Sequence, residues 1–282
     1  MNRSTLLLRA LAPLVAVAAI GCATASGSTA KPALASAAPP PKRAATAPLT
    51  PEQQEAQHRA RTNYQIGVEN LRSGRPAQAI SALLEARRWD PNSERTELAL
   101  SEAYRQQGRV KEAEAHLMRA LQIKPGFHQA LLNLAGIYIQ DERYEAAIAP
   151  LKQLLDDATF PGPWRALSNL GWAEYRLGRI DDAQSHLELA VDQRPDYWPA
   201  RLNLGILQAE RGNRDDAIAQ FQHVLQVGPG PLAEAEVRFR LAEELLSQGD
   251  RQGARRQLTT ASRLEPSGPW SKRSAETLKT LE

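Results

Sequence analysis

The stretch WRALSNLGWAEYRLGRIDDAQSHLELAVDQRPDY, residues 164–197, contains two amphipathic segments separated by a glycine. Apolar residues recur in each segment at three- and four-residue intervals, the spacing of one face of an α-helix. Gly178 suits the end of the first helix, because glycine adopts a positive φ at little cost. Pro195 ends the second helix, since the residue before a proline is pushed out of the α region. The stretch predicts two helices joined by a tight turn.

The same arrangement returns about every 34 residues, and position 8 of each unit is set at the small residue of its Leu-Gly or Leu-Ala pair. Small residues at positions 8 and 20 allow the two helices of a unit to pack closely. The units cover 60–93, 94–127, a third that starts at 128 and carries two extra residues near its end, 164–197, 198–231 and 235–268. A period of 34 built from two helices resembles the tetratricopeptide repeat (TPR). We therefore predict an all-α, right-handed TPR superhelix of six helix-turn-helix repeats over 58–268, closed by a capping helix over 269–282.

The first 21 residues have a charged start and a short apolar run, as signal peptides do. The motif Ala19-Ile20-Gly21-Cys22 resembles the bacterial lipobox, although that motif usually has a larger aliphatic residue where Ala19 stands. The resemblance implies lipidation of Cys22, and Ala23 after it implies the periplasmic face of the outer membrane. Ordinary cleavage after Ala25 is the alternative. Residues 22–57, rich in Ala and Pro, predict a disordered tether, since they bury too little apolar surface to offset their ordering entropy.

Positions 5, 9 and 12 of the first helix form a second stripe, which lines the concave side of a superhelix. A contiguous exposed apolar patch on a soluble protein is usually a binding site. We therefore predict a groove for a protein partner, with these apolar contacts: Tyr64, Val68, Leu71, Leu98, Leu132, Trp172, Tyr175, Leu202 and Ile206. The alternative for part of this stripe is ordinary core, because position 12 also borders neighbouring helices.

Asparagine occupies position 6 of three consecutive repeats, as Asn133, Asn169 and Asn203. A carboxamide both donates and accepts hydrogen bonds, so such a ladder can pair with the backbone of an extended peptide. The arrangement resembles the asparagine ladders of other peptide-binding TPR superhelices. The alternative is that each asparagine bridges to a neighbouring repeat. No repeat has the Lys at 5 and Asn at 9 of chaperone adaptors, which disfavours recognition of a chaperone C-terminus.

Catalytic motifs are missing from the sequence, and the five histidines lack the spacing of metal ligands. We expect no enzyme activity, no metal, no small-molecule substrate and no cofactor besides a covalent lipid on Cys22. Arg3 and Arg9 lie in the predicted signal peptide, and the rest of the sequence has 33 basic and 32 acidic residues. It contains no basic stripe with interleaved aromatic residues. Nucleic-acid binding therefore has no electrostatic support.

A secreted, lipidated chain of six TPRs resembles the pilotins of type IV pilus biogenesis, the Tgl and PilF/PilW group. The third repeat sharpens the resemblance, because Phe160-Pro161 precedes Asn169-Leu170-Gly171, like the aromatic-proline step of that family. The resemblance implies an outer-membrane lipoprotein that binds secretin subunits and promotes their localisation and assembly in that membrane. Two alternatives remain open. One is a periplasmic scaffold for peptidoglycan or outer-membrane assembly factors, and the other is a non-catalytic regulatory subunit of an envelope enzyme.

Overall fold

The computed structural model describes residues 49–281, which form thirteen α-helices and no strand. The predicted signal peptide, Cys22 and most of the predicted tether lie outside these residues. The helices are α1 Pro51–Arg72, α2 Pro76–Trp89, α3 Glu94–Gln106, α4 Val110–Ile123, α5 His128–Gln140, α6 Tyr144–Asp156, α7 Pro163–Arg176, α8 Ile180–Gln193, α9 Trp198–Glu210, α10 Arg214–Val227, α11 Pro231–Ser247, α12 Arg251–Leu264 and α13 Pro269–Thr280. Among the described residues, no helix is both long enough and apolar enough to span a membrane.

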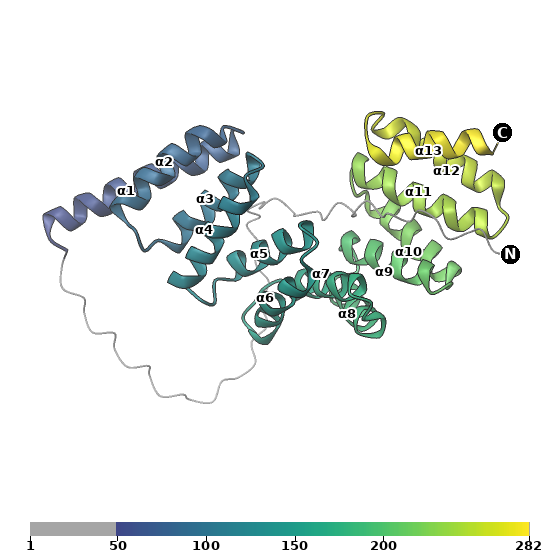
Figure 1. Ribbon diagram of the computed structural model, residues 1–282, viewed down its shortest axis with the longest axis horizontal. Coiled ribbons are helices and arrows are strands. Elements are labelled where there is room, and N and C mark those ends of the chain that lie inside the picture. The colour runs from purple at the N-terminus through teal and green to yellow at the C-terminus, as the bar shows by residue number, and fades with distance from the viewer. Residues whose placement is uncertain (1–48, 282) are drawn as a thin grey trace, which may run out of the picture.

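Helices α1 to α12 form six consecutive helix-turn-helix pairs, and Figure 1 shows them following one another along a curved array from α1 to α13. The predicted TPR superhelix of six repeats with a final capping helix is confirmed. The first helix of each pair is called helix A below and the second helix B. Figure 1 places α1 and α13 at opposite ends of the array.

Small residues set the close approach of helices A and B within a repeat. A Cβ placed on Gly171 of α7 would lie 2.7 Å from Cγ of Leu187 and 3.0 Å from the carbonyl oxygen of Ala183, both on α8. That separation is shorter than van der Waals contact, so only glycine fits at this crossing. The small residue at position 8 therefore allows helices A and B to pack closely, as predicted.

The turn between helices A and B uses a left-handed residue. Gly108 has a φ of 72° and Gly212 a φ of 79°, and no atom lies near the place of a Cβ at either residue. In the third repeat Glu142 stands at this position with a φ of 58°, the only positive φ of a residue other than glycine among residues 49–281. A non-glycine residue here carries backbone strain of about 1–2 kcal/mol.

The apolar core consists of three main clusters of buried side chains. One fills the first two repeats and reaches Ala130, Leu134 and Ile137 of α5. The largest runs from Leu131 of α5 to Leu241 of α11. The third joins α11, α12 and α13, where the ring centroids of Phe239 and Trp270 lie 5.4 Å apart. Trp270 thus covers the last repeat, the role predicted for a capping helix.

Helix α1 begins at Pro51, whereas the tether was predicted to continue to residue 57. The segment 51–57 is helical because Thr50 and Gln53 form a reciprocal cap. The backbone N–H of Gln53 donates to Oγ1 of Thr50 over 3.2 Å, and the backbone N–H of Thr50 donates to Oε1 of Gln53 over 2.9 Å. Two N-terminal backbone donors are satisfied in this way. The tether prediction weighed apolar content alone and overlooked this capping box.

Candidate partner-binding face

Helices A of successive repeats follow one another along the array, and positions 2, 5, 6, 9 and 12 of these helices make up what we call the A face. All the predicted partner contacts lie on it, whereas Cys22, the predicted lipidation site, is outside the described residues. Their burial differs sharply between the ends and the middle of the array.

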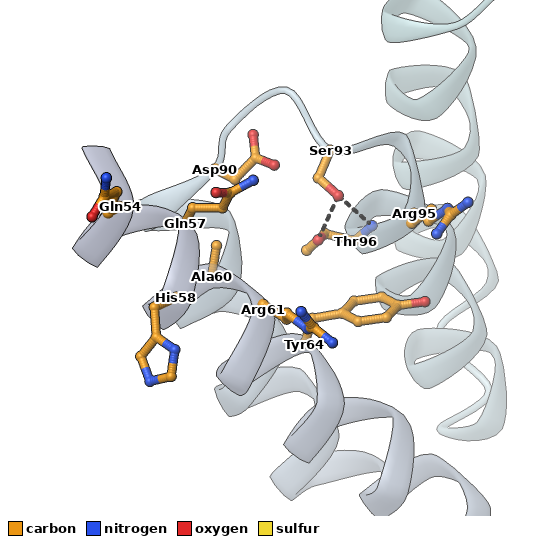
Figure 2. Close-up of a pocket in the computed structure, with 10 residues that line it drawn as sticks. All are labelled: Gln54, Gln57, His58, Ala60, Arg61, Tyr64, Asp90, Ser93, Arg95 and Thr96. Atoms are coloured by element: carbon orange, nitrogen blue, oxygen red, sulfur yellow. Dashed lines mark hydrogen bonds between the residues drawn. The ribbon is translucent and has the colours of Figure 1, made fainter. Parts of the chain in front are cut away.

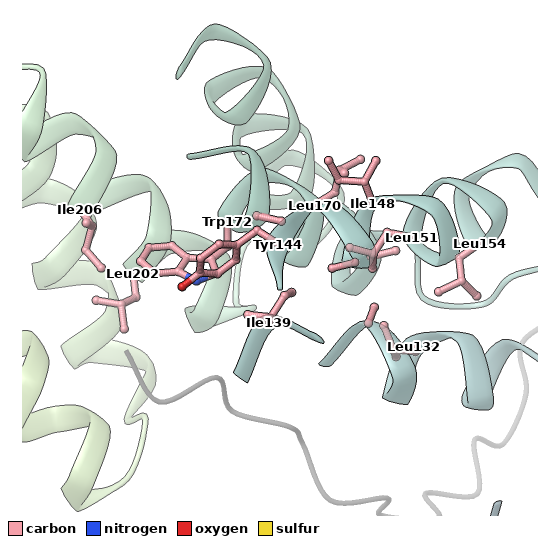
Figure 3. Close-up of a cluster of buried hydrophobic side chains, with 14 of the residues drawn as sticks. Leu132, Ile139, Tyr144, Ile148, Leu151, Leu154, Leu170, Trp172, Leu202 and Ile206 are labelled. Carbon is pink, nitrogen blue, oxygen red and sulfur yellow. The ribbon is translucent and has the colours of Figure 1, made fainter. Parts of the chain in front are cut away.

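Four of the predicted contacts are buried in the middle of the array and have almost no surface. Their exposed fractions are 8% for Leu132, 4% for Trp172, 2% for Leu202 and 5% for Ile206. All four belong to the largest core cluster, and Figure 3 shows Trp172 beside Tyr144. The expectation that these side chains line an open groove is corrected. Helix α7 packs against both α5 and α9, and large apolar side chains of the three helices fill the space between them.

Trp172 is held by aromatic and cationic neighbours. Its ring centroid lies 5.1 Å from that of Tyr175, and the guanidinium of Arg176 lies 5.7 Å from the Trp172 ring and 4.7 Å from the Tyr144 ring. A guanidinium over an aromatic face is attracted by the ring quadrupole. These contacts assign Trp172 a core role rather than a surface role.

The N-terminal part of the A face keeps more surface. Four predicted contacts are half-buried there, namely Tyr64, Val68, Leu71 and Leu98, and Tyr175 is half-buried further along. Tyr64, Leu71 and Leu98 also pack against the N-terminal core cluster with one side. They can offer the other side to a partner.

A pocket of about 430 Å³ lies at this end, between α1 and the segment that joins α2 to α3. Figure 2 shows Tyr64 extending from α1 towards Arg95 of α3, with Gln57 and Asp90 at the other side. The pocket exists because α1 extends N-terminally past the start of the first repeat at residue 60, so its first turns face the loop that contains Ser93.

The pocket combines three kinds of groups. Gln54 and Gln57 supply amides that both donate and accept, Arg61 and Arg95 supply positive charge, and Tyr64 supplies an aromatic face. Neither arginine belongs to an ion pair within residues 49–281. Apart from Ala60 and Tyr64 the lining residues are polar, so the pocket suits a ligand that carries hydrogen-bonding groups.

The predicted asparagine ladder has mixed surroundings. Asn203 donates from Nδ2 to Oγ of Ser168 over 3.5 Å, so this amide bridges to the preceding repeat. Asn133 faces a cavity of about 10 Å³ that is also lined by Ser101 and Glu102 of the preceding repeat. Asn169 is half-buried. The neighbour-bridging alternative therefore holds at Asn203, and peptide binding by Asn133 and Asn169 stays a prediction.

Sequence reasoning missed the charged residues of the A face near its C-terminal end. Arg240 stands at position 6, where three earlier repeats have asparagine, and its Nη2 lies 2.8 Å from Oε1 of Glu236. Burial raises the pKa of the Glu236 carboxyl, and the charge and hydrogen bond of Arg240 oppose that rise. Burial also raises the pKa of Tyr175, with a hydrogen bond to Glu210 adding to it. The shared repeat position was the signal that could have identified Arg240.

Three of the five histidines, His116, His128 and His186, lie next to a carboxylate. Nδ1 of His116 lies 2.6 Å from Oε2 of Glu97, and Nδ1 of His186 lies 2.6 Å from Oε2 of Glu174. These are pairs only. Within residues 49–281 no three His, Cys, Asp or Glu side chains are arranged to hold a metal ion.

Comparisons with known proteins identify relatives in sequence. The chain is 27% identical over 225 residues to cellulose synthase operon protein C of Pseudomonas fluorescens, covering 77% of this chain and 17% of that protein. It is 27% identical over 133 residues to the type IV pilus assembly protein PilF of Pseudomonas aeruginosa, covering 47% of this chain and 53% of that protein. The chain thus spans about half or less of the length of these two relatives.

Solved structures agree with the fold. The structure of Pseudomonas aeruginosa PilF superposes with a TM-score of 0.67 at 20% identity and covers 79% of this chain and 99% of its own. The structure of PilW, described as a widely conserved type IV pilus biogenesis factor, also gives 0.67, at 21% identity over 77% of this chain and 98% of its own. The pattern of the family "Tetratricopeptide repeat" matches residues 70–120, 105–170 and 174–235. The chain belongs to the tetratricopeptide repeat family.

Proposed function

We propose that the protein is an outer-membrane lipoprotein that acts as a pilotin, binding a secretin subunit through its A face and promoting secretin assembly for type IV pilus biogenesis. The observation that carries the proposal is the similarity to PilF in sequence, over repeats that also match PilF and PilW in fold. A lipid on Cys22 would attach the array to the membrane. The array would then deliver its partner there.

The pocket beside Tyr64 is the best place on the A face for the partner. Its amides, arginines and aromatic ring suit an extended segment that is partly apolar and carries hydrogen-bonding groups. The buried middle of the A face has no comparable surface, so Trp172 is excluded from this contact. The partner segment would run from the pocket past Val68 and Leu98.

The test is the affinity of the purified protein for the secretin of the same organism, measured by titration calorimetry. Replacing Tyr64 and Arg95 by Ala should weaken binding at least tenfold, since an aromatic anchor and a charged group at an interface are each commonly worth more than about 1.4 kcal/mol. Gln222→Ala, on the exposed side of α10, is the matched control and should bind like the wild type. Unchanged affinity of the Tyr64/Arg95 variant would show that the pocket is not the binding site. Absence of binding by the wild type would show that the secretin is not the partner.

Anchoring is tested separately. Cys22→Ser should release the protein from the outer-membrane fraction, while its affinity for the partner in solution stays the same. Retention of Cys22→Ser in that fraction after a wash at 1 M salt, which removes electrostatic attachment, would contradict lipid attachment at this residue.

A further inference from the structure

Helix α12 contains four arginines and no acidic residue between Arg251 and Leu264. All four side chains, Arg251, Arg255, Arg256 and Arg263, are exposed. The buried side of the helix consists of small and apolar residues, Gly253, Ala254, Leu258 and Ala261. The arginines therefore occupy the side that faces away from the protein.

These charges have no carboxylate partner within residues 49–281. The ion pairs of that part of the chain include none of the four arginines. In other helices B, arginines at the repeat turns pair with the preceding repeat, as Arg143 does with Glu114 over 2.6 Å and Arg179 with Glu145 over 2.9 Å. Arg251 reaches only the carbonyl oxygen of Leu281, at 3.5 Å.

Helix α13 extends this positive region. It adds the exposed side chains Lys272 and Lys279 at the same end of the array (Figure 1), and these two lysines and the four arginines are together called the α12 basic face. The acidic residues nearby are Asp250, Glu265 and Glu276, and Oδ1 of Asp250 is engaged with the backbone N–H of Gly253 at 2.8 Å. Positive charge exceeds negative charge on this face. Neither α12 nor α13 has an exposed large apolar side chain.

We propose that the α12 basic face docks on a membrane surface of anionic phospholipid headgroups. Each Lys or Arg held near such a surface raises binding by about fivefold, and the increments accumulate because the surface is continuously charged. Six basic groups on one end of the array meet this condition without any need for a complementary shape. The absence of exposed apolar side chains makes the docking electrostatic and reversible.

A second copy of the chain is the competing occupant, because α8 is acidic. Asp181, Asp182, Glu188 and Asp192 are exposed on α8, which has no Lys or Arg between Ile180 and Gln193. Exposed ion pairs between two proteins each contribute at most about fivefold and require matched geometry. They must also offset the entropy lost on association, and the α12 basic face offers no apolar contact to help. Lipid is therefore the favoured occupant.

Docking through α12 does not depend on the proposed pilotin function, because α12 lies at the other end of the array from the pocket (Figure 1). The A face stays available to a partner while the far end rests on the membrane. The two proposals therefore fail separately: loss of partner binding leaves vesicle binding intact, and the reverse also holds.

The experiment measures cosedimentation of the full chain with vesicles of phosphatidylcholine alone or mixed with phosphatidylglycerol. Cys22→Ser is present in every protein and serves as the wild type of this comparison, so that no lipid anchor contributes. This protein should bind only the mixed vesicles, and binding should fall at high salt, since the Debye length shrinks from about 8 Å at physiological ionic strength to about 3 Å at 1 M. The triple variant Arg255→Gln, Arg256→Gln and Arg263→Gln should bind the mixed vesicles about 100-fold more weakly.

A matched control distinguishes the effect of the α12 basic face from the effect of net charge. Lys111→Gln, Arg119→Gln and Lys152→Gln remove the same charge from exposed positions on α4 and α6 and should leave vesicle binding unchanged. Every variant keeps residues 1–48, so any contribution of that segment cancels. Equal losses in the two triple variants would overturn the proposal. So would wild-type binding that ignores phosphatidylglycerol, or α12-dependent self-association in light scattering without vesicle binding.

Discussion

The imidazole of His116 lies with Nδ1 2.6 Å from Oε2 of Glu97, and its ring stacks on Tyr104 with centroids 5.1 Å apart. Glu97 is only 1% exposed, and its Oε1 has no hydrogen-bond partner among the described residues. Arg87 comes no closer than 4.0 Å. The histidine is therefore the main polar partner of a buried carboxylate that joins helices α3 and α4.

His116→Ala should lower the free energy of unfolding by about 2 kcal/mol, because it leaves a buried carboxylate without a hydrogen bond. Urea unfolding followed by circular dichroism measures the change. The double variant Glu97→Leu/His116→Leu removes both polar groups and should lose less stability than His116→Ala. If the single variant is as stable as the wild type, the pair has no structural role.

Glu142→Gly should raise the free energy of unfolding by about 1 kcal/mol, because glycine relieves the left-handed strain at the turn of the third repeat. The ion pair that is lost, from Arg176 to Glu142 at 3.9 Å, is long, and its carboxylate is exposed. Gly108→Ala makes the reverse change at the same position of the second repeat and should lower stability by about 1 kcal/mol. Thermal melts of the two variants should shift in opposite directions; shifts of the same sign would contradict the strain.

Trp172→Ala should lower the free energy of unfolding by about 3–5 kcal/mol, as expected for truncation of a large buried aromatic side chain. Tyr64→Ala should cost less, because Tyr64 is half-buried. Chemical denaturation measures the free energy of unfolding of both variants and so distinguishes the core residue from the surface residue. A smaller loss for Trp172→Ala than for Tyr64→Ala would contradict the burial described for the middle of the A face.

Asp157 should titrate far below an ordinary aspartate. Hydrogen bonds from Thr159 and then His128 lower its pKa from 3.8 to about 2. Since the native pKa is the lower one, Asp157 contributes stability above pH 3.8 that is lost as the pH falls through about 2. The difference in melting temperature between wild type and Asp157→Asn should therefore shrink over that interval. Carboxyl NMR measures the pKa directly, and a midpoint near 3.8 would refute the assignment.

The helix pairs and their turns followed from the residue pattern. Gly171 and Leu187 had to meet because small and large apolar residues recur at fixed positions of the repeat, and the array forms with that register. Phe160-Pro161 likewise marked the irregular end of the third repeat, where the segment between α6 and α7 is held by Asp157. Local spacing was sufficient for these features.

The surface of the A face was less predictable. Spacing along one helix shows which side a residue occupies, but not how near the next helix A lies. Trp172 and Leu202 share the stripe with Tyr64 and Val68, yet the first two are enclosed by α5, α7 and α9. At the N-terminal end no helix precedes α1 among the described residues, so Ile66 is 48% exposed although it occupies a core position of the repeat.

The division of the core into an N-terminal, a central and a C-terminal cluster has a consequence for motion. In a linear array each unit is supported only by its neighbours, so the two outer blocks each lack support on one side. Amide hydrogen exchange should be slowest between α5 and α10 and faster towards both ends. The first two repeats can then open locally to bind a partner while the repeats between α5 and α10 stay folded.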